Sequence, residues 1–170
     1  LAITIAEQKR FTYYKYEDYK PLLDEAVAYA QKNNKPKLLS SAYLEVGSNL
    51  IDSLPYQALK IFETGKKIAV KNQFKIDETI YDRRIGITYY KSLNNFKLAR
   101  HYLNLSLEKC KQEKFEEGIG YVYINQAFIL RKEGKPKEAL ELFNKTFSLK
   151  FDNYRTLFNL NVYLFISDTY

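Results

Sequence analysis

Apolar residues recur along this chain at the spacing of an α-helix, and the same arrangement returns about every 40 residues. Ala58, Ala99 and Ala139 lie 41 and 40 residues apart, and each is followed four positions later by a large apolar side chain. Apolar residues three and four positions apart fall on one face of a helix. A fixed period of this length indicates a protein built by stacking copies of one helical unit.

Polar breaks between the periodic segments define the expected elements. Pro36, Pro55 and Pro136 follow such breaks and fit the first turn of a helix, where a missing N–H group breaks no hydrogen bond. Short connections make consecutive helices run antiparallel. The pattern therefore predicts an all-α fold with about nine antiparallel helices, over residues 1–13, 17–33, 37–52, 55–71, 75–92, 95–112, 115–133, 136–149 and 153–170. We expect one domain, 1–170, with hairpins over 1–33, 37–71, 75–112 and 115–149 and a half hairpin over 153–170.

Both helices of each hairpin carry the repeat. The first helices share positions 40 residues apart, among them Gly47, Ile87, Ala127 and Ser167. The second helices alternate a large residue with a small one, at Leu23 and Ala26, Phe62 and Gly65, Leu103 and Ser106, and Phe143 and Thr146. Alternating large and small side chains let neighbouring helices interdigitate, so we expect these positions to form the core.

The hairpin over 115–149 resembles the tetratricopeptide repeat family. The positions that carry the resemblance are Tyr123, Ala127, Leu130, Gly134, Ala139 and Phe143. The other hairpins depart from the pattern, with Ser53 or Asn94 in place of the glycine, and the period of 40 exceeds the family's 34, which implies longer helices. Forty-residue variants are similar to parts of bacterial sensor and regulator proteins. The resemblance implies an αα-hairpin superhelix that binds a protein or peptide in a signalling protein, either periplasmic or cytoplasmic.

By analogy with that family, the first helices line a concave binding face. The positions that would face this groove are Tyr81, Arg84, Thr88, Lys91, Tyr121, Asn125, Phe128 and Arg131. Aromatic rings would supply contact area, and the cations would hold a carboxylate. The lysines of the family's carboxylate clamp are missing, so a chaperone C-terminus is disfavoured as the ligand.

The charge of the chain keeps two other hypotheses open. With 27 basic and 20 acidic residues the net charge is +7, which a nucleic-acid-binding helical repeat could use. However, the tyrosines recur at core spacing and the lysines alternate with glutamates, so a solvated surface is favoured and nucleic acid is disfavoured. The third hypothesis is a structural segment that self-associates.

No apolar run reaches the length of a membrane span. The lack of methionine and the apolar final helix predict a fragment of a longer protein.

Residues for catalysis or metal binding are sparse. His101 and Cys110 are the only histidine and cysteine, and at 1.5 Å per residue they lie about 13 Å apart along one helix. This separation excludes a hydrogen-bonded nucleophile and base. A lone histidine also cannot form a multi-histidine metal site. Gly118 and Gly120 begin a helix without the rest of a phosphate loop. We therefore expect no enzyme activity, no metal and no cofactor.

Overall fold

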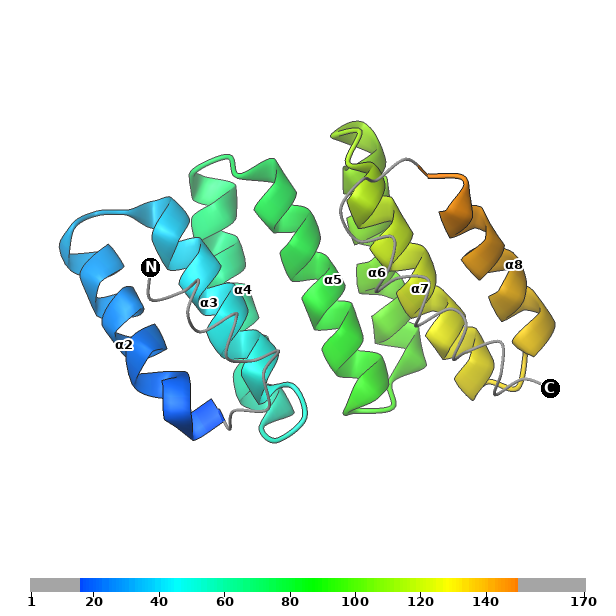
Figure 1. The fold of residues 1–170 in the computed structure, drawn as a ribbon, viewed down its shortest axis with the longest axis horizontal. Coiled ribbons are helices and arrows are strands. Elements are labelled where there is room, and N and C mark those ends of the chain that lie inside the picture. The colour runs from blue at the N-terminus through cyan, green and yellow to red at the C-terminus, as the bar shows by residue number, and fades with distance from the viewer. Residues whose placement is uncertain (1–15, 150–170) are drawn as a thin grey trace.

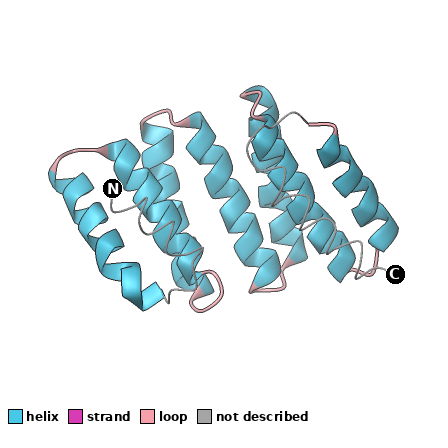
Figure 2. Ribbon diagram, in the orientation of Figure 1, coloured by secondary structure: helices cyan, strands magenta, loops and turns pink. Residues whose placement is uncertain are grey.

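The structure is a computed structural model that describes residues 16–149, and this part of the chain is entirely helical. Consecutive helices run in opposite directions and are joined by short turns (Figures 1 and 2). The helices are α2 (Tyr16–Lys32), α3 (Pro36–Leu50), α4 (Pro55–Lys71), α5 (Lys75–Lys91), α6 (Phe96–Gln112), α7 (Glu116–Lys132) and α8 (Pro136–Phe147). These bounds confirm seven of the expected helices, each end within two residues of its predicted position. The helices expected over 1–13 and 153–170 lie outside the described residues.

The helices pack in pairs, and the pairs stack side by side. Within the pairs α3 packs against α4, α5 against α6, and α7 against α8; α4 also contacts α5, and α6 contacts α7. The first helices of neighbouring pairs touch as well, since α3 contacts α5 and α5 contacts α7. Figure 1 shows α3, α5 and α7 standing in one row with α4 and α6 behind them. None of the described helices is long and apolar enough to cross a membrane.

The core consists of the positions that recur in the sequence. Ala58, Ala99 and Ala139 are fully buried. The large second-helix residues Leu23, Phe62, Leu103 and Phe143 are also buried, as are the small residues Ala26, Gly65, Ser106 and Thr146. This confirms the prediction that the described members of these series pack inside. The repeated sequence positions therefore form the same buried face in each helical pair.

Four of the turns close in the same way. A residue with positive φ stands in each one: Asn34, Gln73, Lys114 and Gly134. The residue that follows the one with positive φ donates its N–H group to the carbonyl oxygen of the residue five positions before itself. Lys35 donates to Ala30 in this way, and Lys135 donates to Leu130, each at 2.9 Å. This closure satisfies the last carbonyl groups of a helix and favours glycine at the positive φ. Only Gly134 meets that preference.

A buried carboxylate joins three helices. Asp82 in α5 is fully buried and accepts hydrogen bonds from Lys66 in α4 at 2.5 Å and from Lys109 in α6 at 2.7 Å. The two lysine side chains are only 24% and 31% exposed, so water screens the pairs less than at an open surface. The cluster fixes the position of α5 against the second helices on either side.

Candidate functional site

A cleft of about 600 Å³ lies where the C-terminal ends of α5 and α7 meet. Its lining residues are Tyr90, Lys91, Phe128, Arg131 and Lys132. Both helices end at the same edge of the protein, the lower edge in Figure 1. Both also carry basic residues in their last turn, where the helix dipole favours positive charge. The antiparallel stacking thus gathers cations from two repeats around one hollow.

Aromatic rings form the floor of the cleft. The hydroxyl group of Tyr90 donates a hydrogen bond to Asn125 Oδ1 at 3.1 Å, and Asn125 Nδ2 donates to the Tyr121 carbonyl oxygen at 2.6 Å. Phe128 packs edge-on against Phe143 of α8, with ring centroids 6.0 Å apart and planes at 86°. These contacts hold both rings in place from below, so the floor is preformed and apolar.

Cations form the rim. Lys132 Nζ donates to the carbonyl oxygen of Tyr90 at 3.4 Å and lies 5.9 Å from the centre of the Tyr90 ring. Lys91 Nζ lies 2.7 Å from Asp52 Oδ2, and because both side chains are half exposed or more this pair is weak and easily exchanged. Arg131 is half-buried in the last turn of α7. The rim therefore offers three positive groups above an apolar floor.

The environment of Tyr90 keeps its hydroxyl group protonated. Burial raises the pKa of Tyr90 to about 12, although the positive charges of Arg83 and Arg84 act in the opposite direction. Burial likewise lowers the pKa of Arg83, whose guanidinium group lies 4.8 Å from the centre of the Tyr121 ring. Tyr90 therefore stays a neutral hydrogen-bond donor well above the pH at which an exposed tyrosine ionises, and the charges in the cleft lining are those of Lys91, Arg131 and Lys132.

Of the eight residues expected to face a groove, some line the cleft, some lie half-buried outside its lining and some are buried in the core. Lys91, Phe128 and Arg131 line the cleft, whereas Arg84 and Tyr121 are half-buried outside its lining. The prediction that they face a groove is wrong for Tyr81 and Thr88, which are fully buried, and for Asn125, which is 7% exposed and is not among the residues that line the cleft.

The cause of these corrections is the central place of the first helices. Each is covered by its own partner, by the preceding second helix and by neighbouring first helices, so little of its circumference reaches solvent. Tyr81 donates to the Ser40 carbonyl oxygen at 2.7 Å, and Thr88 donates to the Arg84 carbonyl oxygen at 2.9 Å.

Two cleft residues were missed by sequence reasoning. Tyr90 shares a repeat position with Leu50 and Leu130, and all three are 8% exposed, so its periodicity correctly indicated packing. The small exposed part of its ring happens to form the floor. Lys132 ends α7, and such a lysine is expected at a helix C-terminus whether or not it binds anything. Only the juxtaposition of two helix ends gives either residue a place in the cleft.

The residues that line the cleft include no histidine, cysteine or carboxylate. No group of three or more His, Cys, Asp or Glu side chains that could hold a metal ion occurs within residues 16–149. Cys110 is buried, and burial raises the pKa of its thiol, which disfavours the nucleophilic thiolate. An apolar floor with a basic rim can instead hold an apolar side chain that has carboxylates beside it.

Comparisons of the chain with protein-family models, with curated proteins and with solved structures give no match.

Proposed function

We propose that this chain is a non-catalytic, tetratricopeptide-like repeat module, an αα-hairpin superhelix, that binds an acidic peptide segment in the cleft between α5 and α7. The observation that carries the proposal is the meeting of an aromatic floor with Lys91, Arg131 and Lys132 in one cleft of about 600 Å³. Contacts between successive first helices, and turns that close alike, support the repeat architecture.

The chemistry of the cleft sets the ligand. The rings of Tyr90 and Phe128 gain free energy when an apolar side chain displaces water from them. The cations of the rim attract carboxylates, and a guanidinium group such as that of Arg131 can bind a carboxylate through two hydrogen bonds. We therefore expect a peptide with a leucine or phenylalanine flanked by aspartate or glutamate.

Such a ligand would touch two repeats at once. Lys91 belongs to one helical pair, and Phe128, Arg131 and Lys132 belong to the next. A peptide bound across both would favour those arrangements of the stack in which the cleft has the right width. This coupling fits a sensory or scaffolding part of a bacterial signalling or regulatory protein, in which a small change of curvature is passed to another domain.

The test uses fluorescence anisotropy with a labelled peptide that has one leucine between aspartates. We expect saturable binding that weakens about tenfold in the double variant Arg131→Gln, Lys132→Gln, because two of the three rim charges are lost. The matched control is Lys135→Gln, Lys137→Gln, which removes the same charge at exposed positions outside the cleft. Equal weakening in both variants would show that net charge alone binds the peptide.

Two competing probes separate the alternatives. A peptide with serines in place of the aspartates should bind at least about tenfold more weakly, because the rim would lose its partners. A single-stranded oligonucleotide should not displace the acidic peptide. Tight binding of the oligonucleotide, with no binding of the acidic peptide at low salt, would overturn the proposal in favour of a nucleic-acid-binding repeat.

A further inference from the structure

The turns after α2 and α4 lie next to each other at one edge of the protein. Lys37, at the start of α3, lies 2.5 Å from Asp77 at the start of α5, and its Nζ atom is 5.0 Å from the centre of the Phe74 ring in the α4–α5 turn. Figure 1 shows both turns at the upper edge, opposite the end of α5 that forms the cleft. This edge is therefore a separate surface.

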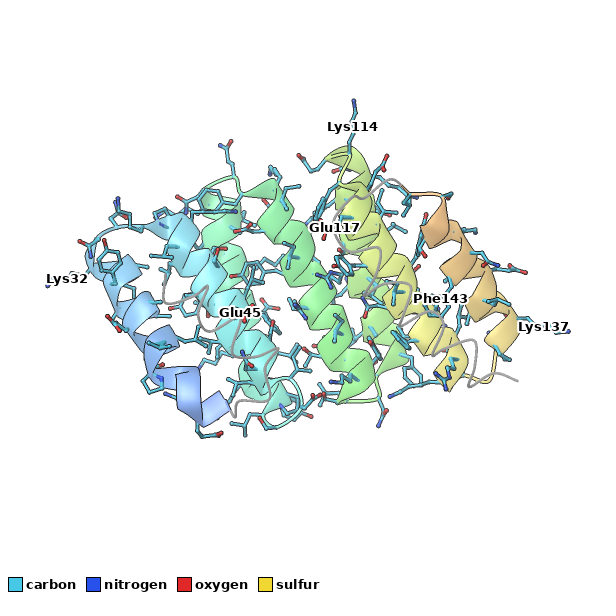
Figure 3. The ribbon with its side chains drawn as sticks, viewed as in Figure 1. Lys32, Glu45, Lys114, Glu117, Lys137 and Phe143 are labelled. Atoms are coloured by element: carbon cyan, nitrogen blue, oxygen red, sulfur yellow. The ribbon has the colours of Figure 1, made fainter. Side chains whose placement is uncertain are left out.

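Lysines without acidic partners gather at these two turns. The segments 31–37 and 70–76 contain no aspartate or glutamate. Lys37 and Lys75 are paired with the buried carboxylates of Asp77 and Glu78. The other lysines of these segments are exposed and form no ion pair with any described residue: Lys32, Lys35 and Lys71. The same holds for Lys67, which lies one helical turn before Lys71 in α4. Figure 3 shows the side chain of Lys32 pointing away from the protein.

Apolar side chains stand exposed among the lysines. Val70 is 51% exposed and Ile76 is 37% exposed, on either side of the α4–α5 turn. Tyr29, one turn before the end of α2, is 54% exposed. We call this surface the basic edge: Lys32, Lys35, Lys67 and Lys71 with Tyr29, Val70 and Ile76. It combines lysines that form no ion pair with aliphatic and aromatic side chains exposed in the helix ends that flank the two turns.

We propose that the basic edge docks on the surface of an anionic lipid bilayer. Lysines near such a surface are attracted to its headgroups, and exposed apolar side chains are stabilised at the boundary between headgroups and acyl chains. A nucleic acid could pair with the lysines, but its phosphates would leave Val70 and Ile76 without an apolar partner. Two adjacent protruding turns also suit a broad surface better than a strand that needs a groove. This role is independent of the cleft.

The first test is cosedimentation of the whole chain with lipid vesicles. We expect binding to vesicles of phosphatidylglycerol and phosphatidylcholine, little binding to phosphatidylcholine alone, and a decrease as salt is added. Changing Lys32, Lys35, Lys67 and Lys71 to glutamine should weaken binding at least about tenfold. The matched control changes four exposed lysines elsewhere to glutamine: Lys97, Lys135, Lys137 and Lys145. If the control weakens binding as much, net charge rather than this edge attracts the lipid and the proposal fails.

The second test separates a lipid surface from a nucleic acid. The double variant Val70→Asn, Ile76→Asn keeps every lysine, and we expect it to bind the anionic vesicles about threefold to tenfold more weakly because apolar insertion is lost. A single-stranded oligonucleotide should bind the parent chain and this variant equally weakly. If the variant binds vesicles as the parent does, or if the oligonucleotide binds tightly and the four lysine changes abolish it, the edge is not a lipid-docking surface. Circular dichroism confirms that each variant is folded.

Discussion

A Cβ atom added to Gly65 would lie 2.0 Å from the hydroxyl oxygen of Tyr81. The Tyr81 ring crosses from α5 to the surface of α4 at this glycine and also meets Phe62 edge-on, with ring centroids 6.3 Å apart. Its hydroxyl group reaches further and donates to the Ser40 carbonyl oxygen in α3. Three helices from two successive pairs are thus joined at one side chain, and only a residue without Cβ leaves room for it.

Gly65→Ala should therefore destabilise the fold. Alanine is about 1 kcal/mol better than glycine inside a helix, but overpacking of a filled core costs about 1–3 kcal/mol, and a clash with a fixed ring belongs at the upper end. We expect a net loss of about 1–2 kcal/mol in the free energy of unfolding by urea. Thr64→Ala, at the exposed neighbouring position, is the control and should change stability by less than about 0.5 kcal/mol. A Gly65→Ala variant as stable as the parent would contradict the packing described here.

The cluster around Asp82 should respond cooperatively to the loss of its lysines. Removing Lys66 or Lys109 alone leaves the buried carboxylate with one cation, so each change to alanine should cost only about 1–1.5 kcal/mol. Removing both leaves a buried charge without a partner, for which a loss of about 3–5 kcal/mol is typical. The double-mutant cycle, measured by urea unfolding, should thus give more than the sum of its single changes. Additive losses would mean that water already solvates Asp82.

The recurring small and large positions were predictable from the sequence because their spacing follows the geometry of the helix itself. Leu103 and Ser106 must share a face wherever their helix is placed. The faces of the first helices were harder to predict. Tyr81 and Thr88 are buried because α5 is enclosed by four other helices, and no local pattern reveals how many neighbours a helix has.

The candidate cleft was predictable in part, because helical spacing alone shows which residues share a face of one helix. Phe128 and Arg131 lie on one face of α7, and helical spacing was enough to group them. Lys91 was expected with them because the repeat places it in the equivalent position of α5. Tyr90 and Lys132 enter the cleft through the way two helix ends meet, which depends on the angle between successive pairs rather than on any residue spacing.

Lys114 is predicted to be a site where glycine stabilises the protein. Its φ of 53° lies in the left-handed region, which costs a residue with Cβ about 1–2 kcal/mol. Lys114→Gly removes that strain but adds freedom to the unfolded chain, so we expect a net gain of about 0.5–1 kcal/mol in thermal or urea unfolding. Gly134 supplies the reverse experiment, because its φ is 74° and a Cβ there would meet nothing within 4 Å. Gly134→Ala should lose about 1 kcal/mol, and a change of the same sign in both variants would refute this account.

Alkaline pH should destabilise the protein partly through Tyr90. Its pKa is raised from 10.0 to about 12 in the folded chain, so below pH 10 it is neutral in both states and its contribution to stability is complete. Between these values the unfolded chain loses the proton while the folded chain keeps it. The free energy of unfolding therefore falls as pH rises, by about 3 kcal/mol for this residue once the folded pKa is reached.

Tyr90→Phe tests this slope separately from the loss of the hydrogen bond to Asn125. Losing the bond lowers stability by about 1 kcal/mol at every pH, whereas losing the ionisable group makes the decline between pH 10 and 12 shallower. Urea unfolding across that range should thus show the variant about 1 kcal/mol below the parent at neutral pH, and the two curves should meet and cross before pH 12. Tyr56→Phe, at an exposed position, should leave the profile as it is in the parent. Parallel curves for Tyr90→Phe and the parent would mean that Tyr90 ionises alike in the folded and unfolded chains, and that its hydroxyl group is open to water.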